Sequence, residues 1–149
     1  MKSIVYIGAD HAGFKLKEHL KNFLSKQGYV VSDQGNIKFE KKDDYPDYAK
    51  RVAQAVGKVK DARGILICNN GIGMSIAANK VKGVRAALTN NLKIAREAVV
   101  DDNANILCLG QGHINKKEAE KIVMTFLTTE FSNLARHKRR IKKIMKLEA

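Results

Sequence analysis

The sequence is short of aromatic residues. It has no tryptophan, and phenylalanine and tyrosine together make up only 6% of its 149 residues. Proteins that bind single-stranded nucleic acids usually stack bases on aromatic side chains, so this shortage argues against that class. No apolar run is long enough to cross a membrane, and the run near the start is interrupted by Asp10 and His11. We therefore expect neither a secretory signal nor a membrane span, and a cytoplasmic protein.

Cysteine is also scarce. Cys68 and Cys108 are the only two, and both lie within or at the end of apolar, strand-like runs. In a chain expected to lack an export signal, such residues are predicted to be free thiols rather than a disulfide. No Cys-x-x-Cys pair and no His/Cys cluster has the spacing of a zinc site, so we predict no metal and no other cofactor.

Acidic residues are outnumbered, because 28 Lys+Arg stand against 15 Asp+Glu and give a formal net charge of +13. Seven of the basic residues lie in 135–149, where the apolar residues form one stripe of a helix predicted over 133–148. A basic surface attracts either nucleic acid or a phosphorylated metabolite. Because no aromatic residues are interleaved with the basic ones, we favour a small phosphorylated ligand and treat nucleic-acid binding as the weaker alternative.

Five apolar, strand-like runs alternate with amphipathic helical patterns along the chain. Strands and helices that alternate in this way form a parallel sheet with right-handed crossovers. The sequence therefore predicts an α/β fold, a three-layer, doubly wound, Rossmann-like domain with a five-stranded parallel sheet, that spans 1–149 as one domain. The predicted strands are 4–8, 29–32, 64–68, 84–88 and 105–109, and the predicted helices are 14–27, 46–56, 73–80, 91–99, 116–129 and 134–147.

In a sheet of this kind, ligands bind beyond the carboxyl ends of the strands. We expect three segments to meet at that edge: 8–11 after the first strand, the loop after Cys68, and the segment that leads into the fifth strand. Within 8–11, Asp10 and His11 are either part of a site or a helix-capping aspartate beside an incidental histidine.

The apolar run 64–68 passes directly into a glycine loop before a short helical segment. Such a junction presents unpaired backbone N–H groups and the positive end of a helix dipole, which favour an anion or a thiolate. Cys68 at this junction is either a small buried residue or a thiolate that acts as a nucleophile or a base. The candidate anion-binding residues of the loop are Asn69, Asn70, Gly71, Ile72 and Gly73.

An ordered set of motifs covers nearly the whole chain: DHAG at 10–13, DYPDYA at 44–49, GILIC and GIGMSIAANK within 64–80, GVRAAL at 83–88, NAN at 103–105 and ARHKRR at 135–140. Together these motifs resemble the ribose-5-phosphate isomerase B family, whose wider group contains galactose-6-phosphate isomerase subunits. The resemblance implies a metal-free aldose–ketose isomerase of the pentose phosphate pathway. Such an enzyme interconverts ribose 5-phosphate and ribulose 5-phosphate through a cis-enediolate.

The resemblance also implies roles for individual residues around the sugar. Cys68 matches the family's base, which moves a proton between C1 and C2 of the sugar. The backbone amides of 69–73 match those that hold the enediolate oxygen, in agreement with the anion-binding junction described above. Asp10 and Tyr45 match residues that line the sugar.

For the phosphate, the resemblance implies a site shared between subunits. His11, Arg136 and Arg140 match the family's phosphate-binding residues, and the two arginines lie on the helix predicted over 133–148. This helix is expected to reach a partner subunit in a homodimer or tetramer.

The chain departs from the family pattern at three places. The family usually has a ring-opening histidine and a ligand-binding asparagine before the fifth strand, where this chain has Asp101 and Asp102. An arginine that usually follows that strand is replaced by Gly112, and the usual Gly-Thr after the cysteine is Asn-Asn at 69–70. We predict that ring opening falls to Asp101 or to solvent, with His113 as a further candidate acid, and that cyclic sugars react slowly.

Two alternatives to the ribose 5-phosphate isomerase stay open. The first is an isomerase that acts on another aldose phosphate, with six carbons. The second is a catalytically impaired homologue that binds a sugar phosphate without turning it over. A nucleic-acid binder would instead show steep salt dependence towards oligonucleotides.

Overall fold

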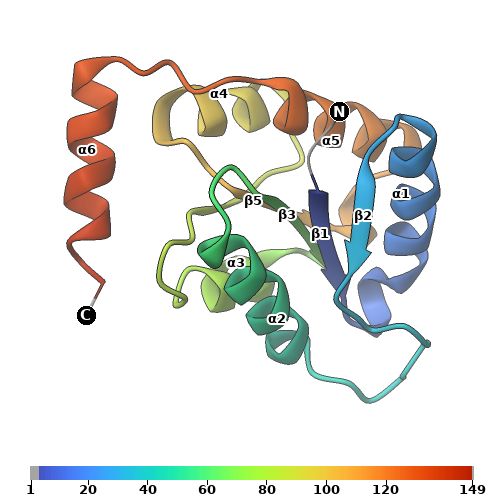
Figure 1. Cartoon of the computed structure of the whole chain (residues 1–149). Coiled ribbons are helices and arrows are strands. Elements are labelled where there is room, and N and C mark those ends of the chain that lie inside the picture. The colour runs from blue at the N-terminus through green and yellow to red at the C-terminus, as the bar shows by residue number, and fades with distance from the viewer. Residues whose placement is uncertain (1–3, 149) are drawn as a thin grey trace.

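The computed structural model describes residues 4–148, which form one sheet with helices on both faces (Figure 1). The strands are β1 (Ile4–Ala9), β2 (Val30–Asp33), β3 (Arg63–Cys68), β4 (Ala86–Leu88) and β5 (Ile106–Gly110). The α-helices are α1 (Phe14–Lys26), α2 (Tyr45–Lys58), α3 (Ile72–Ala78), α4 (Leu92–Asp102), α5 (Lys116–Thr128) and α6 (Ala135–Met145), and two 3₁₀ turns are η1 (His11–Gly13) and η2 (Gln111–His113). None of the helices between residues 4 and 148 is both long and apolar enough to cross a membrane.

The sheet is parallel throughout, with the strand order β2-β1-β3-β5-β4. The chain starts in the inner strand β1 and moves outward to the edge strand β2. It then returns to the other side of β1 with β3. This reversal places the switch point of the fold between β1 and β3, where sheets of this kind bind ligands. The predicted doubly wound, five-stranded parallel sheet is confirmed, and each predicted strand and helix overlaps one in the structure.

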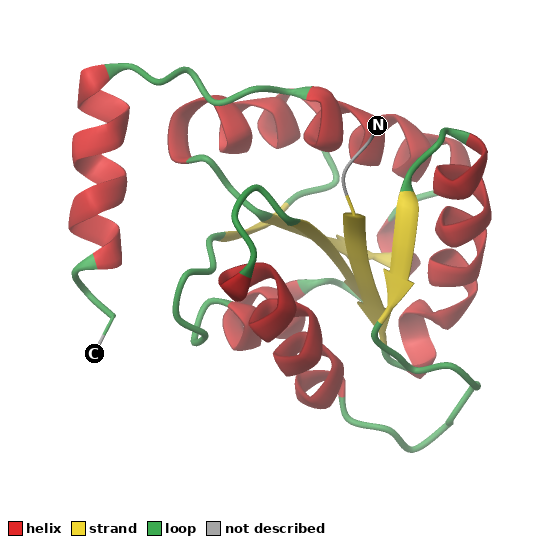
Figure 2. Ribbon diagram, in the orientation of Figure 1, coloured by secondary structure: helices red, strands yellow, loops and turns green. Residues whose placement is uncertain are grey.

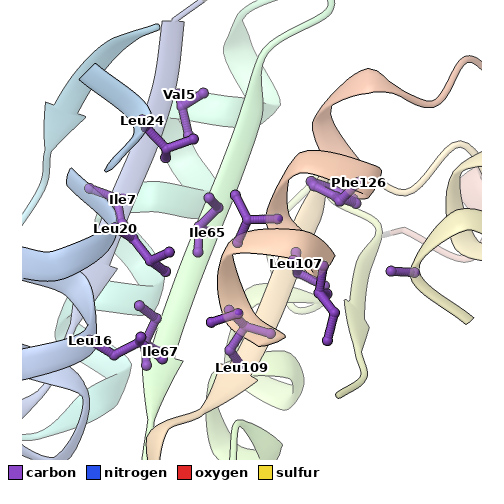
Figure 3. Packing of buried hydrophobic residues seen from close by; sticks show 14 of the residues in the cluster. Val5, Ile7, Leu16, Leu20, Leu24, Ile65, Ile67, Leu107, Leu109 and Phe126 are labelled. Atoms are coloured by element: carbon purple, nitrogen blue, oxygen red, sulfur yellow. The ribbon is translucent and has the colours of Figure 1, made fainter. Parts of the chain in front are cut away.

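Helices cover both faces of the sheet, as the three-layer prediction requires (Figure 2). On one face, Leu20 of α1 and Phe126 of α5 pack into the same cluster as Ile65 of β3 and Leu107 of β5 (Figure 3). On the opposite face, α2 and α3 pack on the other side chains of β3 and β5, and Cys68 belongs to this second cluster. Burial on both faces explains why the central strands are continuous apolar runs.

Helix α6 stands apart from the sheet, on the side of α4, and is joined to α5 by a long connection (Figure 1). It is shorter than the predicted helix over 133–148, because Asn133 has a left-handed backbone (φ 60°) and Leu134 an extended one, so the helix begins only at residue 135. Ser132 N–H donates to Val100 O at 3.2 Å, which ties the start of α6 to α4. A cavity of about 600 Å³ lies between the far end of α6 and the segment 79–87.

Within one subunit, the prediction that the segment before the fifth strand joins Cys68 is wrong. In the parallel pair β3 and β5, Gly64 is opposite Ile106 and Cys68 is opposite Gly110. The segment 101–105 therefore enters β5 at the amino edge of the sheet, whereas Cys68 lies at the carboxyl edge, about 17 Å away at ~3.3 Å per residue. The segment that does reach the Cys68 edge is 111–113, directly after β5.

Candidate active site

Cys68 ends β3 where the glycine loop 69–73 begins. The residue is only 5% exposed, and Gly71 N–H donates to its Sγ at 3.1 Å. Gly71 has a left-handed backbone (φ 79°), and a Cβ at this position would lie 2.5 Å from Leu88 Cδ1. Only glycine fits this turn without strain, and the turn is what aims the amide at the sulfur. A thiolate on Cys68 would be stabilised by this N–H group.

The backbone N–H groups of the loop are partly engaged inside the loop itself. Gly71 N–H points to the sulfur, and Ile72 N–H donates to Asn70 Oδ1 at 3.0 Å. Asn70 thus closes a short Asx-type turn with its own side chain. A ligand that uses the Ile72 amide must first displace the Asn70 side chain.

Asp10 lies next to Cys68 because β1 and β3 are neighbours, with Ala9 opposite Ile67 in the register. Its carboxylate accepts hydrogen bonds from Ala12 N–H at 3.0 Å and Gly13 N–H at 3.2 Å, so the helix-capping interpretation is correct. Burial raises the pKa of the Asp10 carboxyl above its ordinary value, against the opposing effects of His11 and the Gly13 N–H. Asp10 therefore caps the turn and also lies beside the thiol of Cys68.

Tyr45 is the first residue of α2 and reaches the same loop from the opposite side. A Cβ at Gly73 would lie 2.4 Å from the Tyr45 ring, so the ring rests directly on this glycine. Tyr45 remains 39% exposed. The structure thus brings Asp10, Cys68, Tyr45 and the loop 69–73 together, as the sequence predicted.

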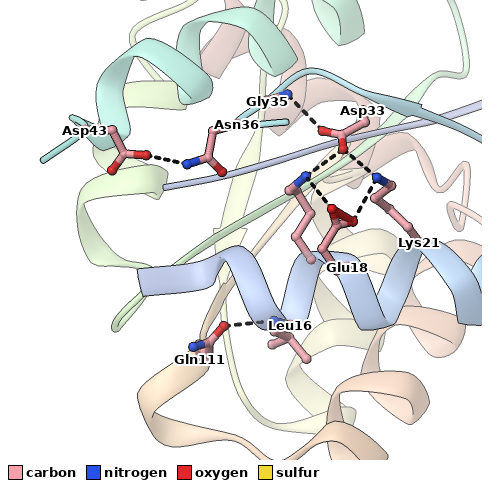
Figure 4. Close-up of polar contacts among 9 residues, drawn as sticks. Leu16, Glu18, Lys21, Asp33, Gly35, Asn36, Asp43 and Gln111 are labelled. Carbon is pink, nitrogen blue, oxygen red and sulfur yellow. Dashed lines mark hydrogen bonds and ion pairs between the residues drawn. The ribbon is translucent and has the colours of Figure 1, made fainter. Parts of the chain in front are cut away.

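His11 is held by Asp43, a residue that the sequence analysis did not single out. Asp43 Oδ1 lies 2.7 Å from His11 Nδ1 and also accepts from His11 N–H at 3.0 Å. The second oxygen of Asp43 accepts from Asn36 Nδ2 at 2.6 Å (Figure 4), and the Asp43 side chain is only 7% exposed. The hydrogen bond that the Asp43 carboxylate accepts from His11 raises the pKa of His11, in spite of some desolvation, with Asp10 adding to the effect. Asp43 therefore fixes the ring through Nδ1 and favours the imidazolium form, which suits an anionic ligand.

Replacing Asp43 by asparagine should lower the pKa of His11. Because the pKa of His11 is raised in the folded protein, the His11–Asp43 ion pair contributes fully to stability below the ordinary histidine pKa of 6.5. This contribution is lost as the pH rises through the pKa of His11 in the folded protein. In Asp43→Asn, His11 should lose its proton at a lower pH, and the affinity for inorganic phosphate should fall off at a correspondingly lower pH. An NMR titration of the His11 ring measures the shift. Asp44→Asn is the matched control because Asp44 is exposed and its side chain makes no capping hydrogen bond, and an equal shift in both variants would contradict the assignment.

Asp10, His11 and Asp43 are also a group that could hold a metal ion, since one ligand atom of each lies within 4.8 Å of the others. In this structure their atoms bind one another and the backbone: Asp10 caps the turn and Asp43 holds His11. A metal at this place would have to break these hydrogen bonds. A site without metal stays a prediction.

Gly112, where the resemblance led us to expect an arginine, lies against Asn69. Gly112 N–H donates to Asn69 O at 3.0 Å, and a Cβ at Gly112 would lie only 2.6 Å from Asn69 Oδ1. The Asn69 side chain thus occupies the space that any side chain at 112 would enter. Beside it, Gln111 Oε1 accepts from Leu16 N–H at 2.9 Å (Figure 4), which satisfies one of the free amides at the start of α1. Asn69 and Gly112 are therefore in direct contact, and we expect substitutions at the two positions to be coupled.

This coupling can be measured with a double-mutant cycle. Gly112→Arg should cost about 1 kcal/mol of unfolding free energy, because the new side chain displaces Asn69. The same change in an Asn69→Gly background should cost much less, since the space is then free. Urea denaturation of the wild type, both single variants and the double variant gives the coupling energy. Additive costs would show that the two positions are independent.

A cavity of about 450 Å³ lies on the other side of the loop, between it and the start of α4. Asn70, Ile72 and His113 are among the residues that line it, and His113 is exposed there. His113 is therefore at the same edge as Cys68, whereas the other candidate for ring opening, Asp101, is at the opposite edge.

The second half of the predicted site gathers at the amino edge. Asp101 and Asp102 end α4, and Arg136 and Arg140 project from α6; all four are exposed. His137, on the same helix, is 6% exposed and places Nε2 at 3.7 Å from Asp101 Oδ1. Within one chain the predicted residues thus form two clusters: the Cys68 cluster (Asp10, His11, Tyr45, Cys68 and 69–73) and the Asp101 cluster (Asp101, Asp102, Arg136 and Arg140, to which the structure adds His137).

Sequence reasoning missed Asp43 and His137. Asp43 is 32 residues from His11, and the only signal was its place beside Asp44 before a predicted helix. His137 stands within a basic run that indicated a solvated helix face, so a buried histidine there gave no local signal. Both become visible only when distant segments are brought together.

Comparison with known proteins places this geometry in a family. The family model described as Ribose/Galactose Isomerase matches residues 5–144. A probable ribose-5-phosphate isomerase B from Mycoplasma genitalium is 45% identical over 145 residues, which cover 97% of this chain and 95% of the relative.

Solved structures agree with this match. The crystal structure of ribose-5-phosphate isomerase B from Mycoplasma genitalium with bound ribulose-5-phosphate has a TM-score of 0.94 and 44% identity, and it covers 99% of this chain and 97% of that one. The type B ribose 5-phosphate isomerase of Trypanosoma cruzi also has a TM-score of 0.94, with 41% identity and coverage of 99% and 97%. The chain therefore belongs to the ribose/galactose isomerase family.

Proposed function

We propose that the protein is an aldose–ketose isomerase that interconverts ribose 5-phosphate and ribulose 5-phosphate through a cis-enediolate. The observation that carries this proposal is the buried Cys68 Sγ, which accepts a hydrogen bond from Gly71 N–H at the start of the glycine loop. Membership of the family and the relative with bound ribulose-5-phosphate support the choice of substrate. The activity requires no metal or cofactor in this proposal, and a cytoplasmic location remains a prediction.

The chemistry is a proton transfer between neighbouring carbons. Cys68, as the thiolate, removes the C2 proton of the open-chain aldose, which leaves a cis-enediolate with its charge on O1. It then returns a proton to C1 while the proton on O2 passes to O1 and the C2=O bond forms, which gives the ketose. The enediolate carries its negative charge on oxygen, beside the backbone N–H groups of 69–73. Asp10 and Tyr45 flank the sugar carbons, Asp10 next to the thiol and Tyr45 over Gly73.

The phosphate would be held by charges from two clusters. His11, whose imidazolium form is favoured by Asp43, supplies positive charge at the Cys68 edge. Arg136 and Arg140 supply two more, but within one chain they belong to the Asp101 cluster at the opposite edge. A complete site therefore needs the Asp101 cluster of a second subunit.

A second copy of this chain also fits the surface. Five large apolar side chains on α3, β4 and the start of α4 are between 39% and 58% exposed, a patch that a lone subunit would leave in water. Edge strand β4 borders this patch. We therefore propose a homodimer, or a tetramer built from such dimers, whose sites are shared, with 133–148 reaching the partner. The apolar residues of this patch are Ile72, Ile76, Leu88, Leu92 and Ile94.

NMR in deuterated water tests the activity directly. Ribose 5-phosphate incubated with the protein should exchange its C2 proton with solvent and form ribulose 5-phosphate. If neither exchange nor product appears, the proposal that the protein isomerises ribose 5-phosphate is wrong. Turnover of a six-carbon aldose phosphate in the same assay would then favour the first alternative.

Binding without turnover of any sugar phosphate would instead favour the impaired homologue. Asp101, Asp102 and Gly112 are the observations that keep this alternative open, because they alter the ring-opening and anion-binding part of the site.

A further inference from the structure

His137 is buried on the most basic helix of the protein, and its two ring nitrogens have different partners. Nδ1 lies 2.6 Å from Ser132 Oγ, and Nε2 lies 3.7 Å from Asp101 Oδ1, which is ion-pair range. The ring also lies 6.4 Å, centroid to centroid, from Phe131. Three consecutive groups therefore line up from the loop before α6 to the end of α4: a hydroxyl, an imidazole and a carboxylate.

The loop fixes this arrangement. Ser132 N–H donates to Val100 O at 3.2 Å, and Ser132 Oγ accepts from Leu134 N–H at 3.2 Å. The hydroxyl keeps both a hydrogen and a second lone pair for Nδ1, so Ser132 Oγ holds Nδ1 in either tautomer while Nε2 faces Asp101. Ser132 thus fixes the orientation of the ring, with Nε2 towards the carboxylate.

Exposure separates the roles of the two acid–base groups. The His137 side chain is 8% exposed, whereas that of Asp101 is 51% exposed. Asp101 is therefore the group that can touch a ligand, and His137 can act only through it. Arg136 and Arg140 lie on the same helix as His137, one residue before it and three residues after it, and both are exposed. A sugar phosphate bound by these arginines would lie on the surface that Asp101 faces.

The proposed substrate creates a need for such a group. Ribose 5-phosphate closes into a furanose ring, and its C2 proton can be removed only after C1 becomes an aldehyde. Opening requires one proton to leave the C1 hydroxyl and one to reach the ring oxygen O4. An aspartic acid alone is a poor proton source at neutral pH, whereas an imidazole exchanges protons there.

We propose that Asp101 and His137 together open the furanose ring, with Asp101 as the catalytic residue that contacts the sugar and His137 as the positioning residue that supplies its proton. The inference rests on the proposed isomerase function and on its shared site. The pair donates a proton to O4 as the C1–O4 bond breaks, and it takes back the proton of the C1 hydroxyl as the C1=O bond forms. The pair and the sugar therefore end with the protons they had at the start.

Two substrates separate ring opening from the isomerisation itself. Ribulose 5-phosphate cannot close into a furanose ring, because its C5 oxygen carries the phosphate. Exchange of its C1 protons with deuterated water therefore reports on Cys68 without ring opening. Conversion of ribose 5-phosphate needs both steps.

In His137→Gln and in Asp101→Asn, kcat for ribose 5-phosphate should fall by about 10²-fold, the usual size of a general acid–base contribution. C1 exchange in ribulose 5-phosphate and inhibition by inorganic phosphate should stay within about twofold of the wild type. Ser132→Ala should show the same pattern with a smaller loss. Lys142→Gln, an exposed change one turn further along α6, is the matched control.

Three results would overturn the inference. A parallel loss of both activities and of phosphate inhibition in His137→Gln would mean that His137 only anchors α6. A selective loss of ribose 5-phosphate conversion in His113→Gln, with no such loss in the Asp101 and His137 variants, would place ring opening at the Cys68 edge. If kcat for ribose 5-phosphate falls in none of these variants, the ring opens in solvent without help from the protein. The proposed function fails separately, if the wild type exchanges neither substrate.

Discussion

Cys68→Ala should lower kcat for ribose 5-phosphate by about 10³-fold or more, because Cys68 is the proposed base and its neighbour Asp10 is engaged in capping η1. Deuterium exchange at C2 of ribose 5-phosphate and at C1 of ribulose 5-phosphate should disappear together. The affinity for inorganic phosphate should hardly change, since the thiol does not contact the phosphate in the proposed site. NMR exchange and phosphate titration of the same sample measure both quantities.

Cys108→Ala is the matched control for this experiment. Cys108 lies on the neighbouring strand, in the same buried cluster as Cys68, and is 0% exposed. Burial raises the pKa of its thiol far above the ordinary value, so the thiol stays neutral and serves only for packing. This variant should lose about 1 kcal/mol of stability and keep its kcat. Residual exchange in Cys68→Ala close to that of the wild type would exclude Cys68 as the base.

The fold could be predicted because each local signal agreed with the final structure. The continuous apolar run 64–68 matches a strand buried on both faces, and the stripe with Leu20 matches the face of α1 that packs on the sheet. The ends of the elements were less predictable. Helix α6 begins at residue 135 because of the backbone at Asn133, and an amphipathic pattern carries no information about that backbone.

The Cys68 cluster was predictable for a different reason. Strand ends and glycine turns are local features, and the strand-order rule places the ends of β1 and β3 side by side. The error over the segment 101–105 came from strand direction: in a parallel sheet only the residues that follow a strand reach the carboxyl edge. The pairs His11–Asp43 and Asp101–His137 could not be predicted, because each joins residues more than thirty positions apart on elements whose packing no local pattern specifies.

Because the two clusters lie at opposite edges of one subunit, two inactive variants should restore activity when they are mixed in one dimer. Cys68→Ala and the double variant Arg136→Ala/Arg140→Ala should each be nearly inactive as pure proteins, the first without a base and the second without most of its phosphate site. In a hybrid dimer of the two, one site would combine both defects. The other would combine Cys68 from one subunit with Arg136 and Arg140 from the other and be intact.

Unfolding and refolding an equal mixture of the two variants should therefore restore activity. Half of the dimers are hybrids by random pairing and each carries one intact site of two, so about a quarter of the wild-type activity per subunit should return. Native mass spectrometry, with an affinity tag on one variant, counts the hybrids in the same sample. If hybrids form and the activity stays at the level of the pure variants, each site is built within one subunit, and α6 must then move to bring its arginines to Cys68. Activity that rises in proportion to the hybrids establishes that neither cluster is a complete site and that the subunit interface is where they meet.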